Sequence, residues 1–155
     1  MNDTEPKQVL RRYLDALVAG DLETVRDSFA EDATWTIKAD LPVAGPWHGR
    51  DQIVDDFLAA VMGERFEPGS HVFTFPTMLA DRDTVALEWH VSARTAAGKP
   101  YENDYCGIFV IRDGRIAAVR EYLDSLYAAR VLFAERAQKI NESKDGKLPL
   151  TVSDD

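Results

Sequence analysis

The fold of this chain is decided by residues 84–124, TVALEWHVSARTAAGKPYENDYCGIFVIRDGRIAAVREYLD. It contains three strand-like segments, residues 84–94, 101–112 and 115–124, which are separated by a turn at Gly98 and by Asp113-Gly114. In the first segment an apolar set of side chains alternates with a polar set: Val85, Leu87, Trp89 and Val91 against Glu88, His90, Ser92 and Arg94. A period of two interrupted by tight turns predicts an antiparallel meander.

Helical patterns precede this meander, and another follows it. We expect a first helix that is capped by Thr4 and ends at Gly20, and a short second helix that is capped by Asp21 and has Phe29 on its inner side. A strand over 33–38, a loop over 40–50 and a third helix over 51–62 follow. Strands over 71–79, 84–94, 101–112 and 115–124 lead to a last helix, which is capped by Ser125 and ends near 140. This order predicts an α+β domain, with three N-terminal helices packed on a curved, mostly antiparallel sheet and a C-terminal helix. Such a cone holds a pocket inside. We expect residues 1–140 to form the domain and residues 141–155 to form a polar tail.

Composition excludes several classes of partner. The chain has 155 residues and a formal net charge of −9, so nucleic acids and anionic membranes are not expected partners. Cys106 is the only cysteine, which rules out an intrachain disulfide and fits a reducing compartment. Residues 1–7 lack a secretory signal pattern and no window is apolar enough to span a membrane, so we expect a cytoplasmic protein. His48 and His71 stand apart from other ligand-type residues, and neither a metal nor an organic cofactor is expected.

Five stretches occur in a recognisable order: residues 11–22 (RRYLDALVAGDL), 29–35 (FAEDATW), 48–51 (HGRD), 98–105 (GKPYENDY) and 113–124 (DGRI and REYLD). Together they resemble the SnoaL-like branch of the nuclear transport factor 2-like superfamily, which includes ketosteroid isomerase and limonene-epoxide hydrolase. The resemblance covers about residues 5–135. It implies the cone-shaped, cystatin-like fold. Isomerases, lyases such as dehydratases, cyclases, hydrolases and non-catalytic binders all share this fold.

The resemblance to ketosteroid isomerases is incomplete at the catalytic positions. Tyr13 lies where those enzymes have an oxyanion-hole tyrosine, but the position of the base falls at about Ile37 and that of the second oxyanion donor near Gly107. Isomerisation by that family's own mechanism is therefore not expected.

The other two comparisons within the superfamily point to the last strand. Relative to limonene-epoxide hydrolases, Glu121 matches one acid position, His90 and Glu88 fall at the other acid and the arginine, and Trp35 and Ile37 replace a tyrosine and an asparagine. SnoaL-type cyclases use an acid on the last strand, and Glu121 is its counterpart.

His90 and Glu121 are accordingly the predicted catalytic pair. If both side chains point into the cone, they can form a carboxylate–imidazole hydrogen bond, and a histidine can both give and take protons near neutral pH. The alternative interpretation makes His90 a half-buried cross-strand residue and Glu121 the salt-bridge partner of an arginine.

The predicted substrate-binding residues surround this pair. They are Tyr13, Trp35, Phe57, Glu88, Asn103, Tyr105 and Leu123. Asn103 and Tyr105 are expected to face Glu88 and His90 and to polarise a substrate oxygen, whereas Cys106 falls on the opposite face. Glu88 could instead lie at the solvent end of its strand, and Tyr13 could be a core residue.

The apolar face formed by Leu87, Trp89 and Val91 then needs a cover, which predicts a homodimer through the sheet. The predicted function is general acid–base catalysis on a hydrophobic, oxygen-bearing small molecule, by isomerisation, dehydration, cyclisation or hydrolysis. A ligand-binding module or a dimerisation scaffold with a collapsed pocket is the alternative.

Overall fold

Two helices open the chain, of which the computed structural model describes residues 4–134. Helix α1 (Glu5–Ala19) has a proline in its first turn and ends at Gly20, as predicted. Thr4 occupies its N-cap position but its side chain makes no capping hydrogen bond. Helix α2 (Leu22–Asp27) is capped by Asp21, whose carboxylate accepts a hydrogen bond from the Thr24 backbone N–H, again as predicted.

Six strands form one sheet in the order β2-β1-β6-β5-β4-β3. Their bounds are β1 Phe29–Ile37, β2 Trp47–His48, β3 Val72–Asp81, β4 Thr84–Arg94, β5 Pro100–Arg112 and β6 Arg115–Leu123. β1 pairs with β6 in parallel, and all other pairs are antiparallel. The turn between β5 and β6 has Asp113 at φ 52° and Gly114 at φ 70°, the pair of positive angles that a tight Asp-Gly hairpin requires. The predicted meander is confirmed.

Several boundaries differ from the prediction. Phe29 begins β1 rather than lying in the second helix, and the expected loop over 40–50 contains the short strand β2, which pairs with β1. The third helical region consists of two segments with wide π-helical turns, η1 (Gln52–Leu58) and η2 (Ala60–Glu64).

At the carboxyl end, helix α3 (Ser125–Leu132) is capped by Asp124 rather than by Ser125, because the Asp124 carboxylate accepts from the Tyr127 N–H. The predicted end of this helix near 140 and the predicted tail over 141–155 lie outside the described residues.

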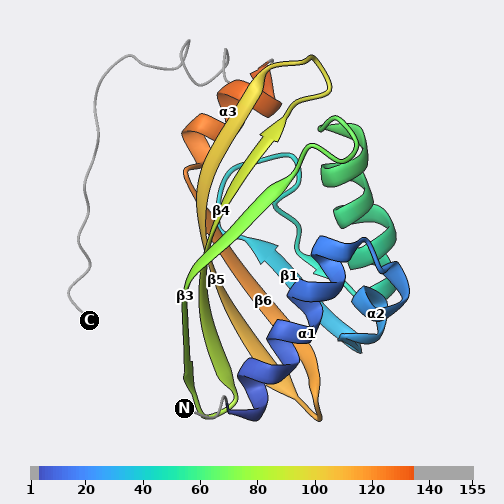
Figure 1. Ribbon diagram of the computed structural model, residues 1–155. Helices are drawn as coiled ribbons and strands as arrows, with labels where there is room; N and C mark the ends of the chain where they lie inside the picture. Colours follow the sequence, from blue (N-terminus) through green and yellow to red (C-terminus); the bar gives the residue numbers. More distant parts are fainter. Residues whose placement is uncertain (1–3, 135–155) are drawn as a thin grey trace, which may run out of the picture.

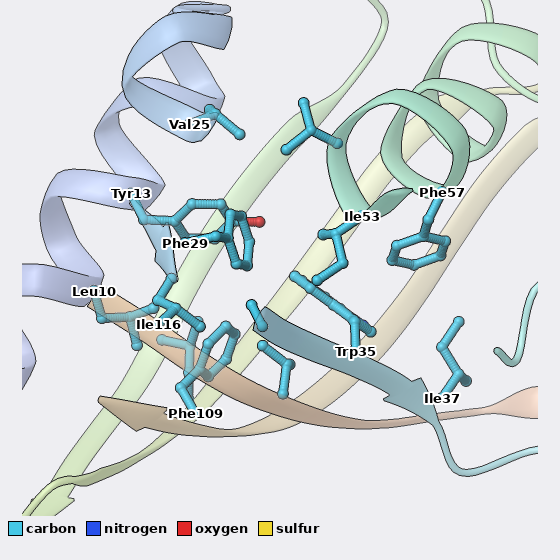
Figure 2. Close-up of a cluster of buried hydrophobic side chains, with 14 of the residues drawn as sticks. Leu10, Tyr13, Val25, Phe29, Trp35, Ile37, Ile53, Phe57, Phe109 and Ile116 are labelled. Atoms are coloured by element: carbon cyan, nitrogen blue, oxygen red, sulfur yellow. The ribbon is translucent and has the colours of Figure 1, made fainter. Parts of the chain in front are cut away.

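Helices α1 and α2 and the η1–η2 segment lie on the same side of the curved sheet, and α3 lies at one end of it (Figure 1). Between these layers is an aromatic core in which Tyr13 of α1, Phe29 and Trp35 of β1 and Phe57 of η1 converge with Phe109 of β5 (Figure 2). The Tyr13 and Phe29 rings meet edge to face at 5.3 Å, and the Trp35 and Phe109 rings do so at 6.0 Å. No helix within residues 4–134 is long and apolar enough to cross a membrane.

The faces of β4 are the reverse of the prediction. Leu87, Trp89 and Val91 point to the helix-covered side, whereas Glu88 and His90 point to the outside of the sheet. The reason is that the helices present apolar stripes, and the strand face that meets them must be apolar too. This apolar face therefore cannot carry a dimer interface. A homodimer through the sheet stays a prediction, and the outer face would have to form it.

Candidate functional site

A pocket lies between the helix-covered face of the sheet and helices α1, η1 and η2. Its residues are mostly aromatic or aliphatic: Tyr13, Leu14, Leu17, Trp35, Phe57, Leu58, Val61, Met62, Phe66, His71, Phe73, Phe75, Leu87, Trp89, Val91, Tyr105, Phe109 and Glu121. The cavity measures about 100 Å³. Glu121 is the one carboxyl group among these residues, so it sits in a site that offers few polar partners.

Strand register places the Glu121 side chain in the pocket. On β6 it lies beside Ile37 of the parallel strand β1 and beside Gly107 of the antiparallel strand β5. Only 6% of the residue is exposed, and its Oε2 accepts a hydrogen bond of 2.7 Å from the Trp35 indole Nε1–H. Burial raises the pKa of Glu121 to about 7, and the Trp35 hydrogen bond, which favours the carboxylate, offsets part of this effect. At neutral pH, Glu121 is therefore present in both protonation states.

This shift predicts how stability depends on pH. Glutamate has a pKa of about 4.5 when unperturbed and about 7 in the fold, so between these values the folded state holds a proton that the unfolded state has lost. Stability should fall as pH rises through this window, and the full cost applies above pH 7. Between pH 5 and pH 8 we expect the wild type to lose about 2–3 kcal/mol more unfolding free energy than Glu121→Gln, whose amide oxygen can still accept from Trp35. Urea unfolding of both proteins at the two pH values measures this, and identical losses would contradict it.

Gly107 is the cross-strand neighbour of Glu121 and lies close to two aromatic rings of the pocket. A Cβ atom at this position would come within 2.6 Å of Phe109 Cε2 and 2.9 Å of Trp89 Cζ3. The missing side chain thus allows two aromatic rings to lie close over the backbone of β5 next to the carboxyl group. Both rings line the pocket together with Glu121, whose burial raises its pKa.

Two tyrosines bring hydroxyl groups to the pocket. Burial, followed by the nearby charge of Glu121, raises the pKa of Tyr13, and burial is also the main cause that raises the pKa of Tyr105. Both side chains consequently stay protonated at neutral pH and can donate hydrogen bonds. The Tyr105 ring stacks on Trp89 with a centroid distance of 5.2 Å and an interplanar angle of 7°.

His90 does not lie in the pocket, and the expected contact with Glu121 is wrong. Its Nδ1 is 2.7 Å from Oδ1 of Asp104, its cross-strand partner on the outer face of the sheet. Glu88 shares that face and accepts a hydrogen bond of 2.7 Å from the Thr77 hydroxyl. The pairing of β4 with β5 sets Tyr105 opposite Trp89 rather than beside Glu88 and His90. One inverted choice of face accounts for all these differences.

The other predicted binding residues divide into two groups. Tyr13, Trp35, Phe57 and Tyr105 line the pocket. Asn103 and Leu123 lie on the same side of the sheet but do not line the pocket; Asn103 is buried in a hydrogen-bond network and Leu123 packs against the core. Within the described part of the chain, residues 4–134, no group of three or more His, Cys, Asp or Glu side chains is arranged to hold a metal ion.

Comparison with known families identifies the domain. The model of the SnoaL-like domain matches residues 10–119, which is more than half of the chain. The chain belongs to the SnoaL-like domain family. A search of curated protein sequences returned no match.

Solved structures share the fold of this SnoaL-like domain. A protein from a soil-derived mobile gene cassette is 27% identical, with a TM-score of 0.70 over 80% of this chain and 92% of its own. An NTF2-like protein from Burkholderia pseudomallei has a TM-score of 0.75 at 16% identity, over 84% of this chain and 98% of its own. TerC, co-crystallised with polyporic acid, has a TM-score of 0.73 at 16% identity, over 84% of this chain and 99% of its own.

Several pocket residues of the SnoaL-like domain were not predicted as binding residues. His71, Phe73 and Phe75 form a ladder at the edge of the sheet, with ring centroids 5.7 Å and 6.2 Å apart. From the sequence, His71 was interpreted only as a histidine that stands apart from other ligand-type residues. The signal was present in the sequence, since aromatic rings at every second residue of a strand share one face. Leu87, Trp89 and Val91 were missed because their face had been assigned to a dimer.

Proposed function

We propose that this protein catalyses a proton transfer on a compact, hydrophobic carbonyl compound, with Glu121 as the acid–base group. The observation that carries the proposal is the buried Glu121 carboxyl in an apolar pocket, with its pKa raised to about 7 and one hydrogen bond from Trp35. A catalytic acid or base is most effective when its pKa is near the working pH, because both protonation states are then available. A glutamate that only stabilised the fold would gain nothing from this isolation.

The pocket lining suggests the class of substrate. Aromatic walls favour a flat, apolar body, and the cavity of about 100 Å³ is smaller than the usual ligand site of roughly 300 Å³ or more. The protonated hydroxyls of Tyr13 and Tyr105 can donate to a carbonyl oxygen. A ketone that carries one aromatic ring, with or without a second fused ring, combines these features. Keto–enol isomerisation and aldol-type cyclisation both begin with removal of a proton next to such a carbonyl. TerC, a protein of the same fold, was co-crystallised with a small organic molecule, polyporic acid.

The positions of His90 and Glu88 on the outer face of the sheet argue against one reaction type, epoxide hydrolysis. An epoxide-hydrolase arrangement would need those two positions in the pocket, and they face away from it. A non-catalytic binding module is the second candidate, and the almost entirely apolar lining favours it.

Exchange of protons for deuterium separates the two candidates without knowledge of the natural substrate. Acetophenone, phenylacetone and 2-indanone are incubated with the protein in D₂O, and loss of the signal of the protons next to the carbonyl is followed by NMR. We expect exchange above the buffer rate that saturates with ketone. Its kcat/KM should rise with pH through about 7, since the base is the ionised form of Glu121. Ketones that bind but do not exchange at any pH would assign the protein as a binding module.

A further inference from the structure

A chain of buried and partly buried hydrogen bonds runs along β5 and ends at the pocket. It joins Asn103, Tyr101 and Tyr105, which alternate on the inner face of the strand, and it begins at the Asp124 backbone carbonyl before α3. We infer that this chain has one direction, so that the Tyr105 hydroxyl donates its hydrogen into the pocket, and that Asn103 is the positioning residue that sets this direction. The inference deepens the proposed function and rests on it: Tyr105 would hold the carbonyl oxygen of the compound on which Glu121 acts.

The orientation of the Asn103 amide is fixed by two groups that each have a single role. Its Oδ1 accepts a hydrogen bond of 2.9 Å from the Asp104 backbone N–H, which can only donate. Its Nδ2 donates at 3.1 Å to the Asp124 carbonyl oxygen, which can only accept. The remaining Nδ2 hydrogen must therefore point to the Tyr101 hydroxyl, 2.9 Å away. The Tyr101 oxygen is an acceptor in this contact.

The acceptor role of Tyr101 also sets the direction of the hydrogen bond between Tyr101 and Tyr105. Tyr101 and Tyr105 hydroxyl oxygens are 2.7 Å apart, and either group could donate. Tyr101 is 0% exposed, and within residues 4–134 its hydroxyl has no acceptor apart from Tyr105. If Tyr105 donated, the Tyr101 hydrogen would be buried without a partner, which is costly. Tyr101 thus donates to Tyr105, and the Tyr105 hydrogen is left for a group in the pocket.

Strand pairing sets Tyr105 close to Glu121. Glu121 pairs with Gly107, and Tyr105 lies two residues before Gly107 on the same face of β5. Side chains at such diagonal positions on neighbouring strands are close enough for one small molecule to contact both. A ketone with its oxygen at Tyr105 can place its α-carbon at Glu121. The carboxylate then takes the α-proton, the C–H electron pair forms the enolate C=C bond, and the carbonyl π electrons move to the oxygen that Tyr105 holds.

Two probes of nearly the same shape test the donor apart from any chemistry. Acetophenone has a carbonyl oxygen where α-methylstyrene has a CH₂ group. We expect the wild type to prefer the ketone, and its carbonyl stretch to move to lower frequency on binding. Tyr105→Phe should weaken ketone binding about fivefold to tenfold, which is the scale of one neutral hydrogen bond, and leave alkene binding unchanged. Tyr122→Phe is the matched control on the exposed outer face of β6. Equal losses for both probes in Tyr105→Phe, or an unchanged ketone preference, would overturn the inference.

Asn103→Asp tests the positioning role, because a carboxylate at this position only accepts. The Tyr101 hydrogen would turn toward it, Tyr105 would donate to Tyr101, and the pocket would lose its donor although Tyr105 is intact. The ketone preference and the infrared shift should both disappear, with the fold checked by circular dichroism. If the aspartate variant does not fold, Tyr101→Phe is the alternative test. It should give an intermediate preference for the ketone over the alkene, because the Tyr105 hydroxyl hydrogen is then free to rotate. A full preference in either folded variant would overturn the positioning role.

The same probes separate this inference from the proposed function. Ketone preference and infrared shift should persist in Glu121→Gln, since they need no proton transfer. Absence of exchange in the wild type together with a Tyr105-dependent preference would refute catalysis and support the donor. Exchange in the wild type without such a preference would refute the donor alone.

Discussion

Glu121→Gln is expected to lower the rate of ketone proton exchange about a hundredfold or more, the usual scale for a lost acid–base group. The amide keeps the shape of the side chain and an oxygen that can accept from the Trp35 indole, but it cannot take up a proton at neutral pH. Ketone affinity should change little. The measurement is the exchange rate by NMR at saturating ketone, with the dissociation constant determined separately by quenching of tryptophan fluorescence.

Glu88→Gln is the matched control for this substitution. It makes the same chemical change on β4, but on the outer face of the sheet, where Glu88 contacts Thr77. We expect wild-type exchange from this variant. Equal exchange by Glu121→Gln and the wild type would show that another group removes the proton, and the proposed role of Glu121 would have to be given up.

Phe109→Ala should lower the free energy of unfolding by about 3–5 kcal/mol, the range for truncation of a buried phenylalanine. Phe109 is 1% exposed, and its ring contacts those of Tyr13, Trp35 and Trp89 at centroid distances of 6.5, 6.0 and 6.4 Å. The substitution leaves a cavity at the junction of α1, β1 and β4. Urea unfolding at pH 5 measures the loss, since Glu121 stays protonated in the folded protein at that pH.

Val110→Ala is the control for Phe109→Ala. Val110 is the next residue of β5 and points to the outer face, opposite Thr84 and Ala118. Because its side chain is only partly buried, we expect a loss well below that of Phe109→Ala. Similar losses for the two variants would mean that the faces of β5 are assigned wrongly.

Much of the fold could be predicted from residues that act locally. Asp113-Gly114 forms a tight turn because these two residues tolerate positive φ, and the turn fixes how β5 meets β6. Asp21 caps α2 because its carboxylate can reach a backbone N–H three residues later. Features that depend on distant residues were less predictable: the two-residue strand β2 exists only because β1 lies beside it.

The candidate site could be predicted in part. Glu121 was identified from its position on the last strand, and Tyr13, Trp35, Phe57 and Tyr105 were named as its surroundings. The His90 assignment was wrong because alternation determines which residues share a face but does not tell which face points inward. The covering helices make that choice here, since their apolar stripes can only be buried against Leu87, Trp89 and Val91.

The sequence by itself therefore determined the order of the elements, the turns and the presence of an acid on β6, because each depends on neighbouring residues or on a short repeat. The tertiary structure alone decided that Glu121 is isolated among aromatic rings and that Asn103 meets Tyr101 and the Asp124 carbonyl. Solvation and hydrogen-bond direction depend on groups that are far apart in the chain. Those two properties, rather than the identity of any single residue, give Glu121 its pKa of about 7 and are the basis for the donor role that we infer for the Tyr105 hydroxyl.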